Sequence, residues 1–242
     1  MNKEKNTYII IYASVMVILV ALILAYTSEA LHPQQAKNEA IDKMRQILTS
    51  LNIASTNADA ESLYKTAVVD AYLIDNEGNR VEGNAFETEL ADELKKPLAE
   101  RKYPVLEALV HGNKKYVLSL RGTGLWGPIW GYISLNDDKN TVYGASFGHE
   151  GETPGLGAEI NKPAFSNEFP GKKIFNNEHK FTSIAIVKPG KTADGQDYVD
   201  GISGGTITSR GVDAMLYSSL EFYVPFLTGR GVSHTPLSQM SK

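Results

Sequence analysis

The most constraining feature of this chain is a run of nineteen uncharged residues, Tyr8 to Tyr26 (YIIIYASVMVILVALILAY). A helix needs about 20 mainly apolar residues to cross a bilayer, and tyrosines at both ends of the run suit the membrane interfaces. A cleaved signal peptide is the alternative, but its apolar region runs to about 7–15 residues, and TSEALHPQ is a poor cleavage site. We therefore expect a retained membrane anchor.

The basic residues predict how this anchor is oriented. Lys3 and Lys5 precede the apolar run, and the next basic residue is Lys37. Positive charge tends to remain in the cytoplasm, so we expect a cytoplasmic N-terminus and a large external C-terminal part. We accordingly divide the chain into residues 1–30, the N-terminal tip and membrane helix, and residues 31–242, one external domain.

The composition excludes several classes of site. The chain has no cysteine, which excludes disulfides, thiolate metal sites, cysteine-held iron–sulfur clusters and cysteine nucleophiles. The net charge is −4 without a basic stripe, which argues against nucleic-acid binding. His111, His149 and His179 lack metal-ligand spacing, so we expect no metal site.

The residues that follow the anchor predict a compact α+β domain. Apolar residues at helical spacing indicate an amphipathic helix over Glu29–Leu51, and a last helix is expected at 212–227. Between them, residues 86–107 predict a short helix broken by Pro97 and Pro104. Apolar–polar alternation bounded by turn residues predicts strands at 67–75, 115–122, 129–136, 141–150 and 181–188.

A glycine- and hydroxyl-rich segment, DGISGGTITSRG at residues 200–211, directly precedes the last predicted helix. Thr206, Thr208 or Ser209 is placed to cap that helix through its hydroxyl oxygen. A helix N-terminus also attracts phosphate, because its free N–H groups and dipole favour an anion. By itself the segment predicts a capped helix more strongly than a ligand site.

Two further loops accompany this segment. Residues 148–159 read GHEGETPGLGAE, and residues 122–127 read GTGLWG before the strand IWGYISL. DGISGGTIT resembles the flavinylation motif D-G-x-S/T-G-A-T of FMN-binding domains, and GETPGLG is similar to their glycine-rich segment. GTGLWG, with the strand that follows it, is similar to the corresponding stretch in the C subunit of Na+-translocating NADH:quinone oxidoreductases. The motifs come in that family's order and span nearly the whole chain.

The resemblance implies FMN held covalently by a phosphoester on Thr206, with Thr208 as the second choice of acceptor. It also implies that a flavin transferase recognises the segment during maturation. The chain departs from the motif at Gly205, where the family usually has alanine. Trp126 is expected to pack in the core or an interface; the alternative, which is more specific, is that it contacts the flavin. The resemblance assigns Asp200, Ser203, Gly204 and Gly205 to the recognised segment, and Glu152, Thr153, Pro154, Gly155 and Leu156 to the surroundings of the isoalloxazine ring.

The function implied is that of a one-electron relay in a respiratory Na+-pumping complex of the bacterial inner membrane, with a periplasmic FMN domain. A 2Fe–2S centre held by other membrane subunits would supply the electron, and the FMN of the B subunit would receive it. The B, D and E subunits, with the A and F subunits, are the expected partners beside membrane lipid. The alternatives are the G subunit of Rnf-type complexes and an anchored binding module without redox chemistry. The chain lacks a dinucleotide fingerprint, so NADH oxidation belongs to the complex.

Overall fold

The computed structural model describes residues 6–229, and their side chains from residue 8 onward. Its contacts divide the chain into two compact units, Met1–Lys43 and Met44–Lys242. We describe each unit by itself. The boundary that we expect at residue 30 marks the end of the membrane helix and not a boundary between compact units, so it stays a prediction.

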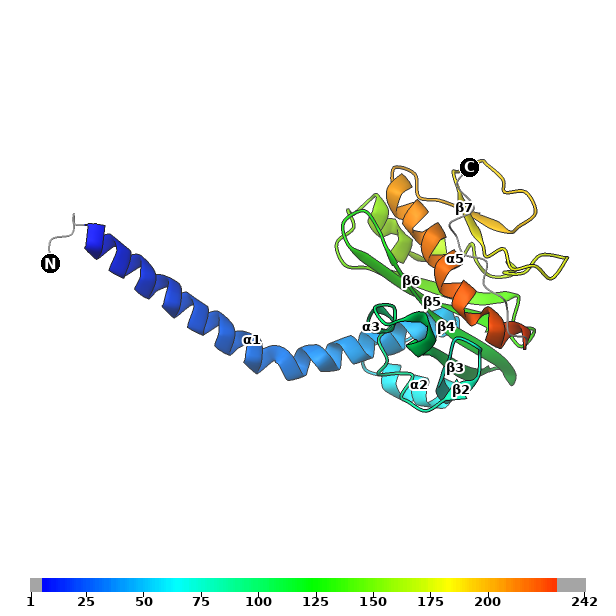
Figure 1. The fold of residues 1–242 in the computed structure, drawn as a ribbon, viewed down its shortest axis with the longest axis horizontal. Helices are drawn as coiled ribbons and strands as arrows, with labels where there is room; N and C mark the ends of the chain where they lie inside the picture. Colours follow the sequence, from blue (N-terminus) through cyan, green and yellow to red (C-terminus); the bar gives the residue numbers. More distant parts are fainter. Residues whose placement is uncertain (1–5, 230–242) are drawn as a thin grey trace. The chain divides into compact units, whose positions relative to one another are not determined.

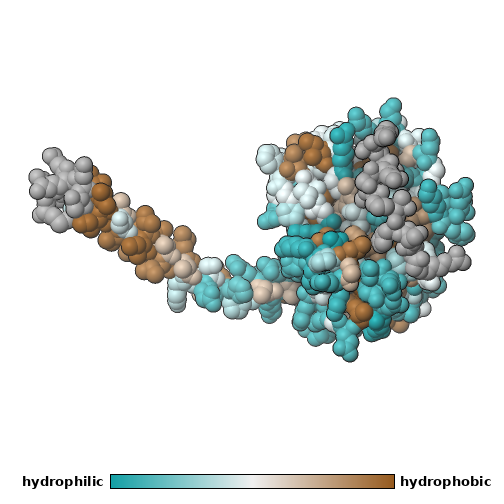
Figure 2. Space-filling model, viewed as in Figure 1, coloured by the Kyte–Doolittle hydropathy of each residue, from teal (hydrophilic) through white to brown (hydrophobic). Residues whose placement is uncertain are grey.

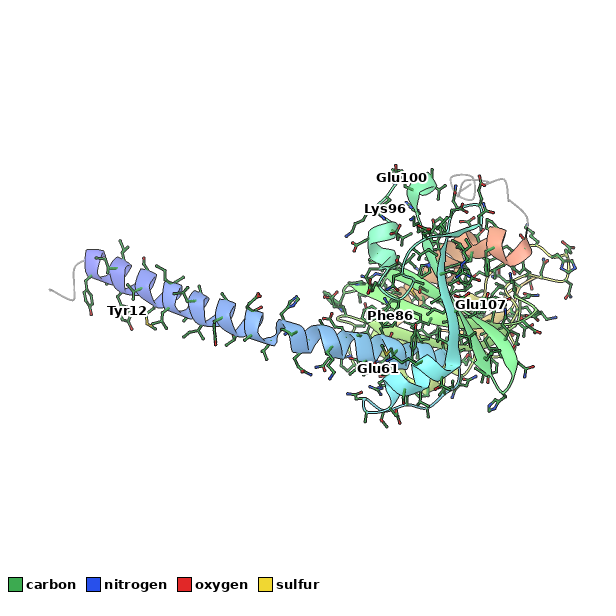
Figure 3. All side chains as sticks on the ribbon, turned by 90° about the horizontal axis from the view of Figure 1, so that it is seen from below. Tyr12, Glu61, Phe86, Lys96, Glu100 and Glu107 are labelled. Atoms are coloured by element: carbon green, nitrogen blue, oxygen red, sulfur yellow. The ribbon has the colours of Figure 1, made fainter. Side chains whose placement is uncertain are left out.

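The first unit consists of a single helical element. Helix α1 (Asn6–Ser50) joins the predicted membrane helix and the predicted amphipathic helix into one, with Pro33 inside it. Its apolar part is long and hydrophobic enough to cross a membrane and is not buried by protein. Figure 2 shows this part in brown and the following part in teal, and Tyr12 points away from the helix with 58% of its surface exposed (Figure 3). These properties fit a single-pass membrane anchor.

The second unit is built on a six-stranded antiparallel sheet with the order β2-β1-β3-β4-β5-β6. Predicted strands 67–75, 115–122, 129–136 and 141–150 are confirmed as β1, β4, β5 and β6. Strands β2 and β3 were not predicted. The strands are β1 (Val68–Ile74), β2 (Arg80–Val81), β3 (Tyr103–Val110), β4 (Asn113–Thr123), β5 (Pro128–Asn136) and β6 (Val142–His149).

Helices cover both faces of this sheet (Figure 1). Helix α5 (Thr206–Thr228) packs on one face, where Gly122 of β4 approaches Met215 so closely that an added Cβ would lie 2.6 Å from it. The last turns of α1 pack on the other face. There the Ser134 hydroxyl donates to the Ser50 carbonyl oxygen, and the Ser146 hydroxyl donates to that of Gln46. The domain therefore includes the end of the N-terminal helix in its core.

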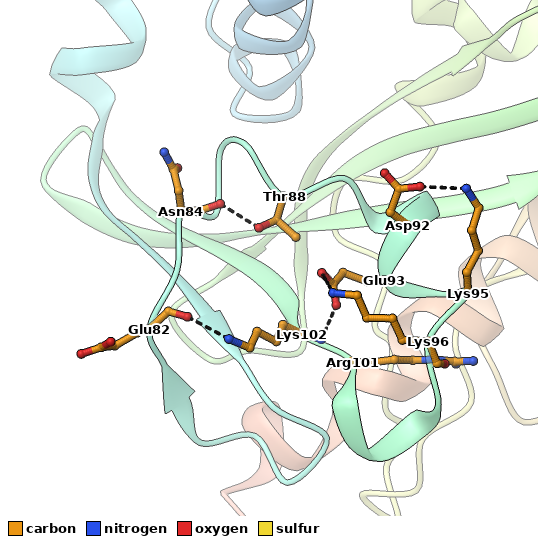
Figure 4. A network of polar contacts seen from close by, with 9 residues as sticks. All are labelled: Glu82, Asn84, Thr88, Asp92, Glu93, Lys95, Lys96, Arg101 and Lys102. Carbon is orange, nitrogen blue, oxygen red and sulfur yellow. Dashed lines mark hydrogen bonds and ion pairs between the residues drawn. The ribbon is translucent and has the colours of Figure 1, made fainter.

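The remaining elements are short. Helix α2 (Ala60–Ala67) follows α1, and helix α3 (Leu90–Glu93) and the 3₁₀ turn η1 (Leu98–Glu100) lie between β2 and β3. Figure 4 shows the polar contacts that hold this connection, among them the Asp92–Lys95 and Glu93–Lys96 ion pairs. Beyond β6 come η2 (Gly157–Asn161), α4 (Pro163–Ser166) and the parallel pair β7 (Ala185–Val187) and β8 (Tyr198–Asp200).

The structure corrects the expectation for residues 86–107 and 181–188. The helix ends at Glu93, before Pro97, while Pro104 lies within strand β3 instead of breaking a helix. The strand predicted at 181–188 is reduced to the three residues of β7, because Phe181 forms only an isolated bridge with Phe175 and Ser183 has a positive φ of 61°. A backbone in the left-handed region cannot continue a strand.

Pro104 lies at the end of the β3–β4 pairing, where a hydroxyl group from α5 contacts its carbonyl oxygen. The register of β3 with β4 extends only to Val105 and Leu118, so Pro104 lies beyond the end of that pairing. The fully buried Tyr223 places its hydroxyl 3.1 Å from the Pro104 carbonyl oxygen and 3.3 Å from that of Ser119. A proline lacks an N–H to donate, and past the last β3–β4 pair Pro104 is paired only with Leu73 of β1.

We expect Tyr223→Phe to lower the free energy of unfolding by about 1–2 kcal/mol, because carbonyl oxygens at the end of the β3–β4 pairing lose their donor. Urea unfolding of the full chain in detergent measures this change. Tyr217→Phe is the matched control, since its hydroxyl has no hydrogen bond among the described contacts. Equal effects of the two substitutions would contradict the role given to the Tyr223 hydroxyl.

Candidate functional site

The glycine- and hydroxyl-rich segment forms the start of α5. The helix begins at Thr206, six residues before the predicted start at residue 212, and its N-cap is Gly205, which makes no side-chain capping bond. The expectation that Thr206, Thr208 or Ser209 caps the helix is therefore wrong. The Ser209 hydroxyl instead accepts a hydrogen bond from the Ile202 N–H at 2.9 Å and so closes the loop in front of the helix.

The two candidate threonines have opposite surroundings. Thr206 is exposed at the first position of the helix, whereas Thr208 is 1% exposed and donates its hydroxyl to Oε2 of Glu152 at 2.5 Å. Two residues along an α-helix turn the side chain by about 200°, because one turn takes 3.6 residues. One hydroxyl therefore faces outward and the other faces the interior.

Glu152 joins three loops at this end of the domain. Its side chain is buried, with 4% exposure, and its Oε1 accepts a hydrogen bond from the Trp126 N–H at 2.9 Å while Oε2 receives Thr208. Burial alone raises the pKa of a carboxyl. Here the hydrogen bonds from Thr208 and from the Trp126 and Leu125 N–H groups outweigh burial and lower the pKa of Glu152 below its usual value. The carboxylate is therefore held in its charged form.

Glycines allow the three loops to approach this closely. A Cβ on Gly157 would lie 2.3 Å from both Oε2 of Glu152 and the Thr208 hydroxyl oxygen, and one on Gly124 would lie 2.4 Å from Oε1 of Glu152. Gly204 has a φ of +77°, a conformation that side chains disfavour. Substitution at any of these positions would displace the loops.

Four large apolar side chains are exposed on the loops that Glu152 joins and on the first turn of α5. Exposed fractions are 47% for Leu125, 68% for Trp126, 43% for Leu156 and 55% for Ile207. Leu156 approaches the α5 loop directly, since its Cδ2 lies 2.7 Å from a Cβ built on Gly204. A group of exposed apolar side chains on neighbouring loops is typical of a binding surface.

The other predicted site residues divide between the surface of the site and its framework. Thr153, Pro154, Gly155 and Ser203 are exposed, and the Thr153 carbonyl oxygen accepts from the Leu156 and Ala158 N–H groups. Gly205 is buried. Asp200 is half-buried at the end of β8, where its N–H donates to Glu168.

Sequence reasoning missed the glycines of the framework. Gly157 and Gly124 were not predicted, although the first lies inside GETPGLG and the second inside GTGLWG. Gly211 belongs to the same set, because a Cβ there would lie 2.4 Å from the Thr123 carbonyl oxygen. The signal that could have found Gly157 and Gly124 is that each lies in a loop motif that also contains a predicted site residue, whereas Gly211 lies within α5.

No metal centre accompanies the site in the described part of the chain, where no three or more His, Asp or Glu side chains gather suitably. The arrangement instead provides the accessible Thr206 hydroxyl at a helix N-terminus, glycine-lined loops and an apolar rim that consists of Leu125, Trp126, Leu156 and Ile207. These are features of an FMN-binding domain, and the family model with that description matches residues 124–221. The match includes the GLW turn, the GETPGLG loop and most of α5.

The chain belongs to the NqrC family, the C subunits of the Na(+)-translocating NADH-quinone reductases. The family member from Vibrio vulnificus (strain YJ016) is 30% identical over 210 residues, covering 79% of this chain and 82% of the relative. The Pseudomonas aeruginosa protein of the same name is 28% identical, and the alignment covers 89% of this chain and 92% of the relative. The similarity thus extends well beyond the FMN-binding domain, and it confirms the family that the motifs resemble.

Solved structures share the fold. The crystal structure of the Na(+)-translocating NADH-quinone reductase C subunit from Parabacteroides distasonis superposes with a TM-score of 0.78 at 54% identity, covering 85% of this chain and 98% of that one. A crystal structure of Shewanella oneidensis NqrC has the same fold, with a TM-score of 0.67 at 23% identity, covering 79% of this chain and 98% of its own. The predicted α+β class is confirmed.

We expect Glu152→Gln to lower the free energy of unfolding by about 1–3 kcal/mol near neutral pH, because it removes the buried acceptor charge. The folded-state pKa of Glu152 is lowered from the ordinary 4.5. Its stabilisation is therefore present above pH 4.5 and is lost as the pH falls through the folded-state pKa. The difference between wild type and variant should shrink in acid, which urea unfolding between about pH 3 and 7 measures. The exposed Glu150 provides the control Glu150→Gln, and a difference independent of pH would contradict the assignment.

Proposed function

We propose that this chain carries FMN on Thr206 through a phosphoester bond and relays single electrons within a Na+-translocating NADH:quinone reductase. The observation that carries the proposal is the contrast between the two threonines. Thr206 is exposed, whereas the Thr208 hydroxyl is buried and donated to Glu152. An external transferase needs a hydroxyl that it can reach, which supports Thr206 as the acceptor.

The position of Thr206 also suits a phosphate. N–H groups in the first turn of a helix have no partner within the helix, and the dipole favours negative charge there. In the transferase, attack by the Thr206 hydroxyl oxygen on the FMN-side phosphorus of a flavin dinucleotide donor would form the new P–O bond and break the bond to the other phosphate. The mononucleotide half of the donor would leave, and the hydroxyl proton would pass to a base or to water. Ser203, Gly204 and the buried Gly205 present little bulk beside the acceptor.

The family pattern has alanine where this chain has Gly205, and the structure allows a test of fit. A Cβ at Gly205 would lie 3.1 Å from Ile202 Cβ and 3.3 Å from the Gly157 nitrogen, so alanine would require small shifts. Glycine therefore keeps the loop geometry without those shifts. We infer that this departure leaves the acceptor site intact.

The apolar rim fits a flat aromatic ring system. Trp126, Leu156 and Ile207 are the side chains that would contact it and keep water from one side, while Thr153, Pro154 and Gly155 contribute exposed backbone. When bound, FMN supplies one-electron redox chemistry, and the protein positions it and tunes its electronics. The buried Glu152 would not touch the flavin ring; its role would be to hold together the loops that contact the ring.

The place of this chain in the complex is inferred from the family. Its relatives are named as C subunits of an NADH-quinone reductase, and the chain has no cysteine with which to hold an iron–sulfur cluster. We infer that a 2Fe–2S centre in neighbouring membrane subunits supplies the electron and that the FMN of the B subunit receives it. The A, B, D, E and F subunits are the proposed partners in the bacterial inner membrane. The anchor would leave the FMN domain in the periplasm, with sodium passage elsewhere in the complex.

We expect Thr206→Val to abolish the covalent flavin and Thr208→Val to retain it. Each variant is produced together with a flavin transferase, and the flavin is read by fluorescence in a denaturing gel. Mass spectrometry of the tryptic peptide 192–210 locates the adduct, because Lys191 and Arg210 flank both threonines without a cleavage site between them. Thr206→Ser is the matched variant that keeps the acceptor hydroxyl.

Thr208→Val also leaves Glu152 without one donor, so we expect about 1–3 kcal/mol of lost stability beside an intact adduct. Loss of the adduct in a folded Thr208→Val protein, with retention in Thr206→Val, would show that the acceptor is Thr208. Wild-type protein without any adduct would contradict the covalent attachment and favour a noncovalent binding module.

A further inference from the structure

A second group of side chains lies on the face of the sheet opposite α5. Neighbouring residues of a strand point to opposite faces, so Arg121 faces away from α5 while Gly122 faces Met215. Arg121 pairs with Trp130 across β4 and β5, and its Cζ lies 5.7 Å from the centroid of the indole ring. The indole N–H donates to Oε1 of Gln46 at 2.8 Å, which fixes the ring under the guanidinium.

The guanidinium of Arg121 has no hydrogen-bond acceptor among the described residues, although it is half-buried. The carboxylates of the adjacent α3 are engaged elsewhere, as Figure 4 shows. Asp92 binds Lys95 at 2.8 Å, and Glu93 accepts from the Lys96 ammonium at 2.7 Å and from the Lys102 N–H at 3.0 Å. The five N–H donors of Arg121 are thus available to a group from outside.

A hollow of about 310 Å³ opens beside Arg121. Besides Arg121, its walls are formed by Ala91, Leu94 and Pro128, by Gly122 and Gly127, and by the exposed Thr123. Arg121 is the single charged residue in these walls. The Trp130 ring, whose centroid lies 5.7 Å from the Arg121 Cζ, places a tryptophan beside this arginine. Those residue types dominate the binding energy of protein interfaces.

We propose that Arg121 receives a carboxylate from an acidic segment of a neighbouring subunit, with Trp130 and Gln46 as the residues that position the guanidinium. The planar guanidinium matches a carboxylate through two parallel hydrogen bonds, and the cation–π contact with Trp130 at 5.7 Å helps to position it. The occupant is assigned by charge, because the hollow offers a cation with free donors and its walls contain no acidic residue, while the neighbouring Asp92 is ion-paired with Lys95. The inference rests on the proposed membership of a multisubunit complex, but not on the covalent flavin.

The test uses the assembled complex purified with Arg121→Glu, with Arg121→Lys, or with the control Lys191→Glu. Lys191 is an exposed cation outside the hollow, and its substitution changes the charge equally. We expect Arg121→Glu to reduce the amount of this chain retained in the complex about tenfold, because the substituted carboxylate would repel the acidic segment of the neighbouring subunit. Arg121→Lys should give an intermediate loss because it keeps the charge without the planar fork.

A photo-crosslinking residue at Ala91, in the wall of the hollow, should capture a peptide that contains aspartate or glutamate from another subunit. Reversing that acidic residue to arginine should restore retention of the Arg121→Glu chain. Flavin fluorescence and thermal unfolding of the isolated chain should remain unchanged, which separates this outcome from failure of the flavin proposal. Retention of Arg121→Glu equal to Lys191→Glu, capture of lipid alone, or loss of folding in both Arg121 variants would overturn the inference.

Discussion

The buried carboxylate of Glu152 is the contact on which the rest of the site depends. A charged group with 4% exposure is costly to bury unless donors surround it. Here the donors come from the GLW turn and from the first turn of α5. Because each donor belongs to a different segment, satisfying this one charge fixes the relative positions of both segments and of the GETPGLG loop that supplies it.

The same contact separates the roles of the two threonines. Thr208 is used to satisfy the carboxylate, and helical geometry then turns Thr206 outward. Exposure of the proposed acceptor therefore follows from the burial of its neighbour. The site combines a rigid interior with an accessible surface, an arrangement suited to the cofactor attachment proposed above.

Local sequence patterns predicted the long alternating strands and the apolar helix, because their signals extend over many residues. They failed where a contact distant in sequence decides the structure. Strand β3 contains Pro104, which local rules assign to a helix break, but Tyr223 from α5 contacts the carbonyl group at that point. The early start of α5 has a similar cause, since Thr208 and Ser209 bond to other loops instead of capping the helix. The motifs indicated which loops form the site, whereas the role of Glu152 as their common acceptor could not be read from spacing.

The end of α1 gives the membrane anchor a second role as part of the domain itself. Ile47, Leu48 and Leu51 are fully buried in the domain core, and Ser134 and Ser146 bond to carbonyl oxygens of the last turns. A shortened chain that begins after the helix would thus expose the sheet face that these side chains cover. Any excised form of the domain has to begin at or before Met44, and a gene fusion that exchanges the anchor must preserve the residues from 44 onward.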